Sequence, residues 1–300
     1  MTTAPTGEHR LTEEHRLTGE PELVEHTVRT TLGPITVSEA GTGPVLVMLH
    51  GGGPGASAVA NYHQNLPALT GHFRVVLPDQ PGFGGSYRPT EEDLDARSIT
   101  EITVDALLQT LDALGIDRFH LLGNSLGGAA AIATALTAPE RVEKLVLMAP
   151  GGGWLPFGPT PTEGQKAMFR YYNGEGPTLK KMRDFIGVMT AEPKRWADTA
   201  QARYEASLDE SHVAFYHRYN AAFAKRHGMD PLWQRVHRIT APTLLLWGRD
   251  DRTITLDGAQ LMLKQLRDVQ LHVFGGCGHW VQLERQAAFE RLVTDFLKED

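Results

Sequence analysis

A serine flanked by two glycines stands where a strand-like segment meets a helix-like segment. Residues 123–127 read Gly-Asn-Ser-Leu-Gly, a G-x-S-x-G pattern. The short apolar run 118–122 before it is typical of a strand, and the alanine-rich run that ends at Ala138 is typical of a helix. A serine on such a sharp turn exposes its hydroxyl, and the glycines let neighbouring segments approach closely. The pattern with these flanks predicts a catalytic Ser125, and the alternative is a structural turn.

Predicted strands and helices alternate along most of the chain. A continuous apolar run such as 45–49 is typical of a strand buried on both faces of a sheet. Helices between successive strands indicate a mainly parallel sheet. We therefore expect an α/β fold with a mostly parallel eight-stranded sheet and helices on both faces. The predicted strands are 23–31, 35–39, 45–49, 73–77, 119–122, 145–148, 243–247 and 271–274, and the predicted helices are 99–114, 126–138, 256–266 and 286–297.

Two segments depart from this alternation. Residues 1–22 are polar, contain Glu-His-Arg-Leu-Thr twice, and are expected to form a mobile tail. Residues 151–239 show helical patterns without a strand signal, which indicates a helical lid inserted over the carboxyl edge of the sheet. The core then consists of residues 23–150 and 240–300. Helices in the lid are expected at about 163–173, 177–190, 193–208 and 211–227.

Charge and composition exclude several classes of protein. The formal net charge of −7, without a Lys/Arg cluster, argues against a nucleic-acid surface. The single cysteine, Cys277, rules out an internal disulfide and fits a reducing compartment. No apolar run is long enough to span a membrane, and the start of the sequence has no secretory signal pattern, so we expect a cytoplasmic protein. The 13 histidines are scattered without a metal-binding spacing, so neither a metal nor a cofactor is expected.

A serine nucleophile needs a base, and the base needs a third group to orient it. In this fold class the three groups occur along the chain in the order serine, acid, histidine. The acid should therefore follow a late strand, and the histidine should follow the last strand. His279 lies in a glycine-rich loop after the last predicted strand, where its alternative is a loop histidine without a role. Asp250 and Asp251 both follow the preceding predicted strand, 243–247. The usual spacing of glycine, two residues and acid selects Asp251, and Asp250 is the alternative.

Acyl-transfer chemistry also needs donors for a developing oxyanion. His50–Gly55, which reads His-Gly-Gly-Gly-Pro-Gly, follows the predicted strand 45–49. The backbone N–H groups of Gly52 in this loop and of Leu126 after the serine are the expected donors. Such a loop can also cradle a phosphate, but no G-K-[ST] follows and no dinucleotide fingerprint is present. Asp79–Ser86 is expected to be a structural turn near the site.

Six segments together resemble the meta-cleavage product hydrolases, which are α/β-hydrolases that split carbon–carbon bonds in ring-fission products of aromatic degradation. The resemblance covers about residues 23–298. Gly-Gly-Gly-Pro-Gly-Ala, Gly-Asn-Ser-Leu-Gly-Gly and His-Val-Phe-Gly-Gly-Cys-Gly-His-Trp-Val-Gln are its most specific parts. Members that act on biphenyl-type and steroid-ring products are the most similar. The segments are His50–Gly55 with Asn61, Asp79–Ser86, Gly123–Gly128, Leu147–Gly152, Trp247–Arg252 and His272–Gln282.

The resemblance implies the substrate and the course of the reaction. The substrate would be a 2-hydroxy-6-oxo-hexa-2,4-dienoate with a further group on C6. The dienol would first ketonise with the help of His279, because a carbanion is a poor leaving group until a ketone can accept its electrons. Ser125 would then attack C6, and the products would be a 2-hydroxypenta-2,4-dienoate and a carboxylic acid. The family also implies a homo-oligomer, a dimer or larger.

The resemblance also implies which residues bind the substrate. Arg203 matches the family's arginine for the dienoate carboxylate, where a guanidinium suits bidentate binding. The alternative for Arg203 is an arginine on the surface of the lid without a role in binding. The alternative for Trp280 is a tryptophan that only packs in the hydrophobic core. The implied contacts with the dienoate are Gly53, Asn61, Asn124 and Trp280. The sequence departs from many members two residues after the acid, where Thr253 and Ile254 replace a bulky apolar residue, so the C6 pocket is expected to be roomier or more polar.

Two other functions remain open at this point. A serine carboxylesterase or peptidase would use the same three residues without a dienoate clamp. A non-enzymatic ligand-binding protein of the same fold would not need an intact Ser125, Asp251 and His279. Turnover of yellow dienolates separates these alternatives, because only a carbon–carbon hydrolase removes that absorbance.

Overall fold

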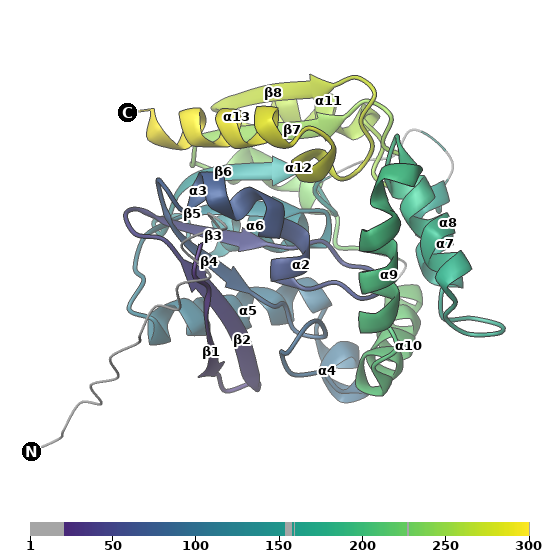
Figure 1. Ribbon diagram of the computed structural model, residues 1–300. Coiled ribbons are helices and arrows are strands. Elements are labelled where there is room, and N and C mark those ends of the chain that lie inside the picture. Colours follow the sequence, from purple (N-terminus) through teal and green to yellow (C-terminus); the bar gives the residue numbers. More distant parts are fainter. Residues whose placement is uncertain (1–20, 154–157, 159, 227, 300) are drawn as a thin grey trace, which may run out of the picture.

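The computed structural model describes residues 21–153, 158, 160–226 and 228–299, which form one open sheet covered by helices (Figure 1). The strand order is β1-β2-β4-β3-β5-β6-β7-β8. Strand β2 runs antiparallel to both of its neighbours, and every other pair is parallel. The strands are β1 Val24–Arg29, β2 Pro34–Ala40, β3 Val45–Leu49, β4 Arg74–Pro78, β5 Phe119–Asn124, β6 Val142–Met148, β7 Thr243–Gly248 and β8 Val269–Phe274. The predicted mostly parallel eight-stranded sheet is confirmed.

Alternate residues of each central strand point to opposite faces of the sheet, and each face is buried under helices. In β3, Val47 and Leu49 belong to one apolar cluster, whereas Leu46 and Met48 belong to another. The first cluster includes residues of α5 (Ile99–Ala113), α6 (Leu126–Thr137) and α11 (Asp257–Gln265). The second includes residues of α2 (Ala58–Tyr62), α3 (Leu66–Leu69) and α13 (Gln286–Lys298). This double burial explains why the central strands read as continuous apolar runs.

Four α-helices of the described residues follow β6 in the chain and precede β7. Figure 1 shows them gathered beyond the arrowheads of the parallel strands β6 and β8, at the carboxyl edge of the sheet. A third apolar cluster packs them against the core through Phe185, Phe215, Tyr216 and Trp280. The helices are α7 Glu163–Arg170, α8 Leu179–Met189, α9 Ala197–Ala206 and α10 Glu210–Lys225. They lie where helical patterns were predicted, and residues 21–22 are the only part of the predicted tail (1–22) among the described residues.

The sequence did not predict α2, α3, α4 (Glu91–Ala96) or α12 (Val281–Glu284). Each is six residues or shorter, so its apolar residues do not repeat over the turns that a periodic pattern requires. Helix α2 is instead recognisable by its cap, because Ser57 Oγ accepts a hydrogen bond from the Ala60 N–H (3.2 Å). Among the described residues, every helix falls short of the length or hydropathy of a membrane span.

Candidate active site

Ser125 occupies the turn between β5 and α6 with backbone angles that side chains rarely adopt. Its φ is 54° and its ψ is −114°. The glycines on either side are needed for space, because a Cβ at Gly127 would lie 2.3 Å from the Leu49 carbonyl oxygen. A Cβ at Gly123 would lie 2.3 Å from the Gly127 carbonyl oxygen. The turn has the strained geometry that the G-x-S-x-G pattern predicted.

Hydrogen bonds from neighbouring segments hold this strained turn in place. The Ser125 N–H donates to the Met148 carbonyl at the end of β6 (3.0 Å). The Ser125 carbonyl accepts from the Gly151 N–H (2.8 Å) and from Ala129 N–H in α6 (3.1 Å). Strain of about 1–3 kcal/mol persists only where the surroundings over-determine it. The turn therefore places the serine at one fixed point of the sheet edge.

His279 and Asp251 form a buried pair at the same edge. His279 Nδ1 lies 2.6 Å from Asp251 Oδ2, and neither side chain is exposed. The other carboxylate oxygen accepts from the Thr253 N–H (2.7 Å) and the Ile254 N–H (3.0 Å). Because the carboxylate accepts, Nδ1 carries the proton and Nε2 has its lone pair free. His279 Nε2 is buried without a hydrogen-bond partner among the described residues.

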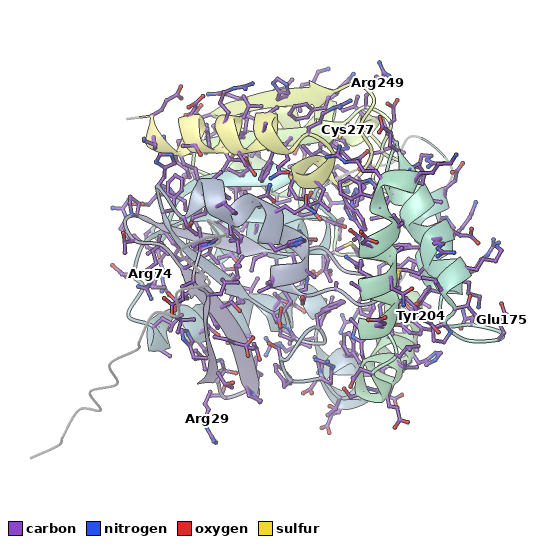
Figure 2. All side chains as sticks on the ribbon, in the orientation of Figure 1. Arg29, Arg74, Glu175, Tyr204, Arg249 and Cys277 are labelled. Atoms are coloured by element: carbon purple, nitrogen blue, oxygen red, sulfur yellow. The ribbon has the colours of Figure 1, made fainter. Side chains whose placement is uncertain are left out.

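The structure separates the two candidate acids. Asp250, the alternative, pairs with Arg249, whose label stands at the edge of the molecule in Figure 2. The hydrogen bond from Arg249 lowers the pKa of the Asp250 carboxyl, as expected for an exposed ion pair. Only Asp251 contacts the histidine, as the spacing rule selected.

The loop that carries His279 is tied to the end of helix α8 by backbone groups and one carboxylate. The His279 N–H donates to the Met189 carbonyl (2.7 Å). Glu284 Oε1 accepts from the Gly278 N–H (2.9 Å), and Oε2 accepts from the Ala191 N–H (2.7 Å). Burial raises the pKa of the Glu284 carboxyl. The sequence analysis missed Glu284, and its place five residues after His279, in a glycine-rich loop with N–H groups to satisfy, was the available signal.

The glycine loop after β3 faces the start of α6. A Cβ at Gly52 would lie 3.1 Å from Leu126 Cδ2, so the loop and the residue after the serine are adjacent. Leu126 is the first residue of α6, and its N–H therefore lacks an acceptor within the helix. His50 is buried and donates from Nδ1 to the Gly51 carbonyl (2.8 Å) while Nε2 accepts from the Gln80 N–H (3.0 Å). Burial lowers the pKa of His50, so a neutral ring braces the loop.

Arg203 reaches this loop from helix α9. Its side chain is buried, Nε donates to the Pro54 carbonyl (3.1 Å), and the guanidinium carbon lies 5.2 Å from the Trp280 ring centroid. A Cβ at Gly53 would lie 3.4 Å from Nη2, so the guanidinium closely approaches the glycine backbone. Burial lowers the pKa of Arg203 to about 10, so the group remains a cation at neutral pH. Tyr171, Tyr172 and Tyr216 are near enough to raise this pKa in part, and no carboxylate among the described residues forms an ion pair with Arg203.

Two asparagines next to these groups have unused polar atoms. Asn124 is fully buried, its Nδ2 lies 3.4 Å from the Met148 carbonyl, and its Oδ1 has no partner among the described residues. A Cβ at Gly51 would lie 2.8 Å from that oxygen, so a larger residue there would displace the Asn124 amide. Asn61 is also buried, with an unpartnered Nδ2. Buried polar atoms without partners are costly, so both asparagines are candidates for ligand contacts.

A small cavity of about 60 Å³ borders Ser125. Gly52, Gly53 and Leu126 line its core side, and Thr253 with Ile254 line another wall. Sequence reasoning missed the apolar wall from α7, α8 and α10, because a helical pattern does not reveal which side chains turn toward a site. The missed residues include Gln165, Met168, Phe169, Phe185, Met189, Tyr216, Tyr219 and Phe223. No group of three His, Cys, Asp or Glu side chains that could hold a metal ion occurs in the described ranges.

Comparison with known proteins agrees with this geometry. The alpha/beta hydrolase fold family matches residues 44–286. A 2-hydroxy-6-oxo-6-phenylhexa-2,4-dienoate hydrolase of Burkholderia cepacia is 38% identical over 268 residues, which cover 88% of this chain and 91% of the relative. A 2-hydroxy-6-oxononadienedioate/2-hydroxy-6-oxononatrienedioate hydrolase of Burkholderia vietnamiensis strain G4 is 39% identical over 266 residues, which cover 87% and 90%.

A solved structure of a relative has the same architecture. The meta-cleavage product hydrolase of Pseudomonas fluorescens IP01 superposes with a TM-score of 0.79 at 31% identity, and the match covers 91% of this chain and 97% of that one. Both the sequence and the fold thus match over nearly the whole length. The chain belongs to the meta-cleavage product hydrolases, within the α/β-hydrolase fold family.

Proposed function

We propose that this protein hydrolyses the C5–C6 bond of a 2-hydroxy-6-oxo-hexa-2,4-dienoate with a further group on C6. Ser125 is the nucleophile, His279 the acid and base, and Asp251 the residue that orients the histidine. The N–H groups of Leu126 and Gly52 receive the oxyanion. The residue pattern, the buried Asp251–His279 pair and the names of the relatives support this assignment.

The observation that carries the proposal is the buried Arg203 guanidinium. A cation that is removed from water without a carboxylate partner among the described residues requires an anionic ligand or costs stability. An ordinary esterase substrate offers no such anion, whereas the dienoate carries a carboxylate that a guanidinium can bind through two hydrogen bonds. Asn124 Oδ1 and Asn61 Nδ2 supply an acceptor and a donor for the C2 oxygen and the carboxylate.

The first step is ketonisation of the dienol. The C2 hydroxyl gives up its proton and C5 gains one, which leaves a C2 ketone and a saturated C5. His279 Nε2 transfers this proton, because it is buried, unpartnered and fixed in its tautomer by Asp251. Arg203 binds the carboxylate and stabilises the negative charge that develops next to it.

The second step breaks the carbon–carbon bond. Ser125 Oγ attacks C6 as His279 removes its proton, and the C6 oxygen becomes an oxyanion bound by Leu126 and Gly52. Cleavage of C5–C6 sends the electron pair into the C2 ketone, which leaves as an enolate and is protonated to the 2-hydroxypenta-2,4-dienoate. A water activated by His279 then hydrolyses the acyl-enzyme to the carboxylic acid.

We propose further that residues 151–239 act as a lid over the core formed by 23–150 and 240–300. Helices α7, α8 and α10 contribute the apolar wall of the cavity at Ser125, and α9 contributes Arg203. Closing this layer excludes water, which strengthens each electrostatic contact with the dienoate. A buried free thiol at Cys277 suits a reducing cytoplasm, and the family resemblance favours a dimer or larger assembly. Light scattering on the purified protein tests the assembly.

The test is turnover of a 6-phenyl dienoate, followed by loss of its yellow absorbance. Arg203→Ala should lower kcat/KM on the order of 1,000-fold, and Arg203→Lys should restore only part of it because an ammonium does not bind a carboxylate in the same two-bond geometry. Arg183→Ala, at an exposed arginine on neighbouring α8, is the matched control and should retain wild-type activity. An unchanged kcat/KM in Arg203→Ala, with turnover of simple esters only, would establish the esterase instead. Dienoate binding without turnover, unchanged in Ser125→Ala, would establish the binding protein.

A further inference from the structure

Two adjacent cavities lie among the helices near Ser125. The serine cavity, the space of about 60 Å³ described above, borders Ser125. A larger space of about 500 Å³, here called the outer cavity, lies between α7, the end of α10 and the segment 228–233. The two spaces have lining residues in common, so they are adjacent across one wall. That dividing wall consists of Gln165, Phe169, Phe223, Met229 and Ile254.

The dividing wall is made of side chains that can move without moving the backbone. Phe169 of α7 and Phe223 of α10 meet with ring centroids 5.6 Å apart at 51°. Met229 packs against Gly151, where an added Cβ would lie 2.8 Å from its sulfur. Methionine has three rotatable bonds and adapts to irregular spaces. Rotation of these three side chains would join the two cavities.

The serine cavity alone is too small for a ring. An apolar cavity of about 150 Å³ is what holds a benzene molecule in a protein interior. A phenyl group on C6 therefore needs the dividing wall to open, and a larger group needs the outer cavity as well. Together the two spaces reach the size of ordinary ligand pockets, about 300–1,000 Å³.

The charge of the lining restricts what that group can be. No Lys, Arg or His occurs among the described residues that line either cavity. Asp230 is the only Asp or Glu among those residues, and its Oδ2 accepts a hydrogen bond from Ser98 Oγ (2.7 Å). A C6 chain that ends in a carboxylate would meet this aspartate without a cation among the described residues that line the two cavities. An uncharged apolar group meets Met168, Phe185, Trp233 and the dividing wall.

On the basis of the function proposed above, we propose that C6 of the substrate carries a large uncharged apolar group that passes between Phe169 and Phe223 into the outer cavity. Sequence identity does not make this distinction. The relative named for a phenyl dienoate is 38% identical, and the relative named for a nonadienedioate, whose chain ends in a second carboxylate, is 39% identical. The chemistry of the two cavities favours the first class and predicts tolerance for groups larger than phenyl.

The experiment compares four dienoates with methyl, phenyl, naphthyl and 2-carboxyethyl groups on C6. We expect kcat/KM for naphthyl to equal or exceed that for phenyl. We expect kcat/KM for 2-carboxyethyl to be about 100-fold or more below phenyl, because like charges are brought together without compensation. Turnover of methyl or 2-carboxyethyl dienoates, with naphthyl rejected, overturns the inference and leaves the proposed function intact. If none of the four dienoates is hydrolysed, the proposed function itself is overturned.

Two substitutions on α10 test the route through the outer cavity. Ala224 lines the outer cavity, whereas Ala221 on the same helix is exposed and lines neither space. Ala224→Trp should lower the naphthyl-to-methyl ratio of kcat/KM about tenfold or more by filling the space, and Ala221→Trp should leave the ratio unchanged. Ala224→Arg should raise kcat/KM for 2-carboxyethyl about tenfold, because it supplies the missing cation. Equal ratios in Ala224→Trp and Ala221→Trp, with both variants folded by circular dichroism, would show that the C6 group lies elsewhere.

Discussion

The carboxylate of Asp251 holds His279 through one oxygen and is itself held through the other. Oδ2 lies 2.6 Å from His279 Nδ1, and Oδ1 accepts the N–H groups of Thr253 (2.7 Å) and Ile254 (3.0 Å). The ring is therefore fixed in both position and tautomer, with Nε2 as its free basic nitrogen. An amide of the same shape at position 251 would present its NH₂ group to Nδ1. The histidine would then carry its proton on Nε2, where it could not accept the serine proton.

Asp251→Asn should accordingly lower kcat by about 10³- to 10⁴-fold with little change in the fold. Asp250→Asn is the matched control, because the Asp250 side chain pairs with the exposed Arg249 and not with His279, and its kcat should stay within about twofold of wild type. Stopped-flow turnover of a 6-phenyl dienoate measures both. A larger loss in Asp250→Asn than in Asp251→Asn would reverse the assignment of the acid.

Glu284 should act as a positioning residue for the His279 loop. Its two oxygens accept N–H groups from Gly278 and Ala191, so it joins the histidine loop to the end of α8. In Glu284→Gln one of these N–H groups faces an amide NH₂, and an unsatisfied buried donor costs about 1–3 kcal/mol. We expect kcat to fall about tenfold or more with KM changed much less, because the histidine moves while the Arg203 clamp stays. Glu290→Gln on α13 is the control.

A change in KM alone, with kcat retained, would show that Glu284 shapes substrate binding and not the position of the histidine. The pH dependence of stability gives a second readout. The raised pKa of Glu284 means that the folded state keeps its proton to a higher pH than the unfolded state, so stability falls as pH rises through that interval. Glu284→Gln should remove this decrease, and an unchanged decrease in the variant would show that another group titrates in that interval.

The strain at Ser125 predicts a gain in stability at the expense of activity. Glycine adopts the φ of 54° at Ser125 freely, so Ser125→Gly should raise the free energy of unfolding by about 1 kcal/mol relative to Ser125→Ala. Ala133→Gly, in the middle of the same helix α6, should lower it by about 1 kcal/mol because glycine disfavours a regular helix. Urea denaturation measures both changes. Destabilisation of equal size in the two glycine variants would mean that the turn stores no strain.

The sequence was sufficient to place Ser125, Asp251 and His279 because each lies in the turn or loop after a parallel strand. His279 follows the edge strand β8, which is largely exposed or half-buried, whereas Ser125 and Asp251 follow the buried strands β5 and β7. A continuous apolar run identifies such a strand, and the carboxyl ends of parallel strands meet at one edge of the sheet. The chemical groups after those runs are thereby brought together without knowledge of any long-range contact. The same argument placed the glycine loop with Gly52 and Gly53.

The walls of the site could not be predicted in this way. The rotation of α7, α8 and α10 about their axes decides whether Phe169, Phe185 and Phe223 face the substrate or the solvent, and tertiary packing sets that rotation. Glu284 was missed because a carboxylate in a four-residue helix has the pattern of a surface residue until its N–H partners are known. Arg203 was placed only through the family resemblance, since an arginine on a helix is ordinarily exposed.

His212 should make the protein less stable in mild acid. Its side chain is buried in α10, Nδ1 lies 3.2 Å from the Gly82 carbonyl, and burial lowers its pKa to about 4. An unfolded histidine has a pKa near 6.5, so between these values the unfolded state binds the extra proton and the folded state is disfavoured as pH falls. The free energy of unfolding should thus drop by about 2 kcal/mol between about pH 7.5 and pH 5 on account of this residue.

His212→Gln should remove that part of the slope, and His237→Gln, at an exposed position, should keep it. Urea denaturation at both pH values measures the slopes, and identical slopes for wild type and His212→Gln would show that another group responds to acid.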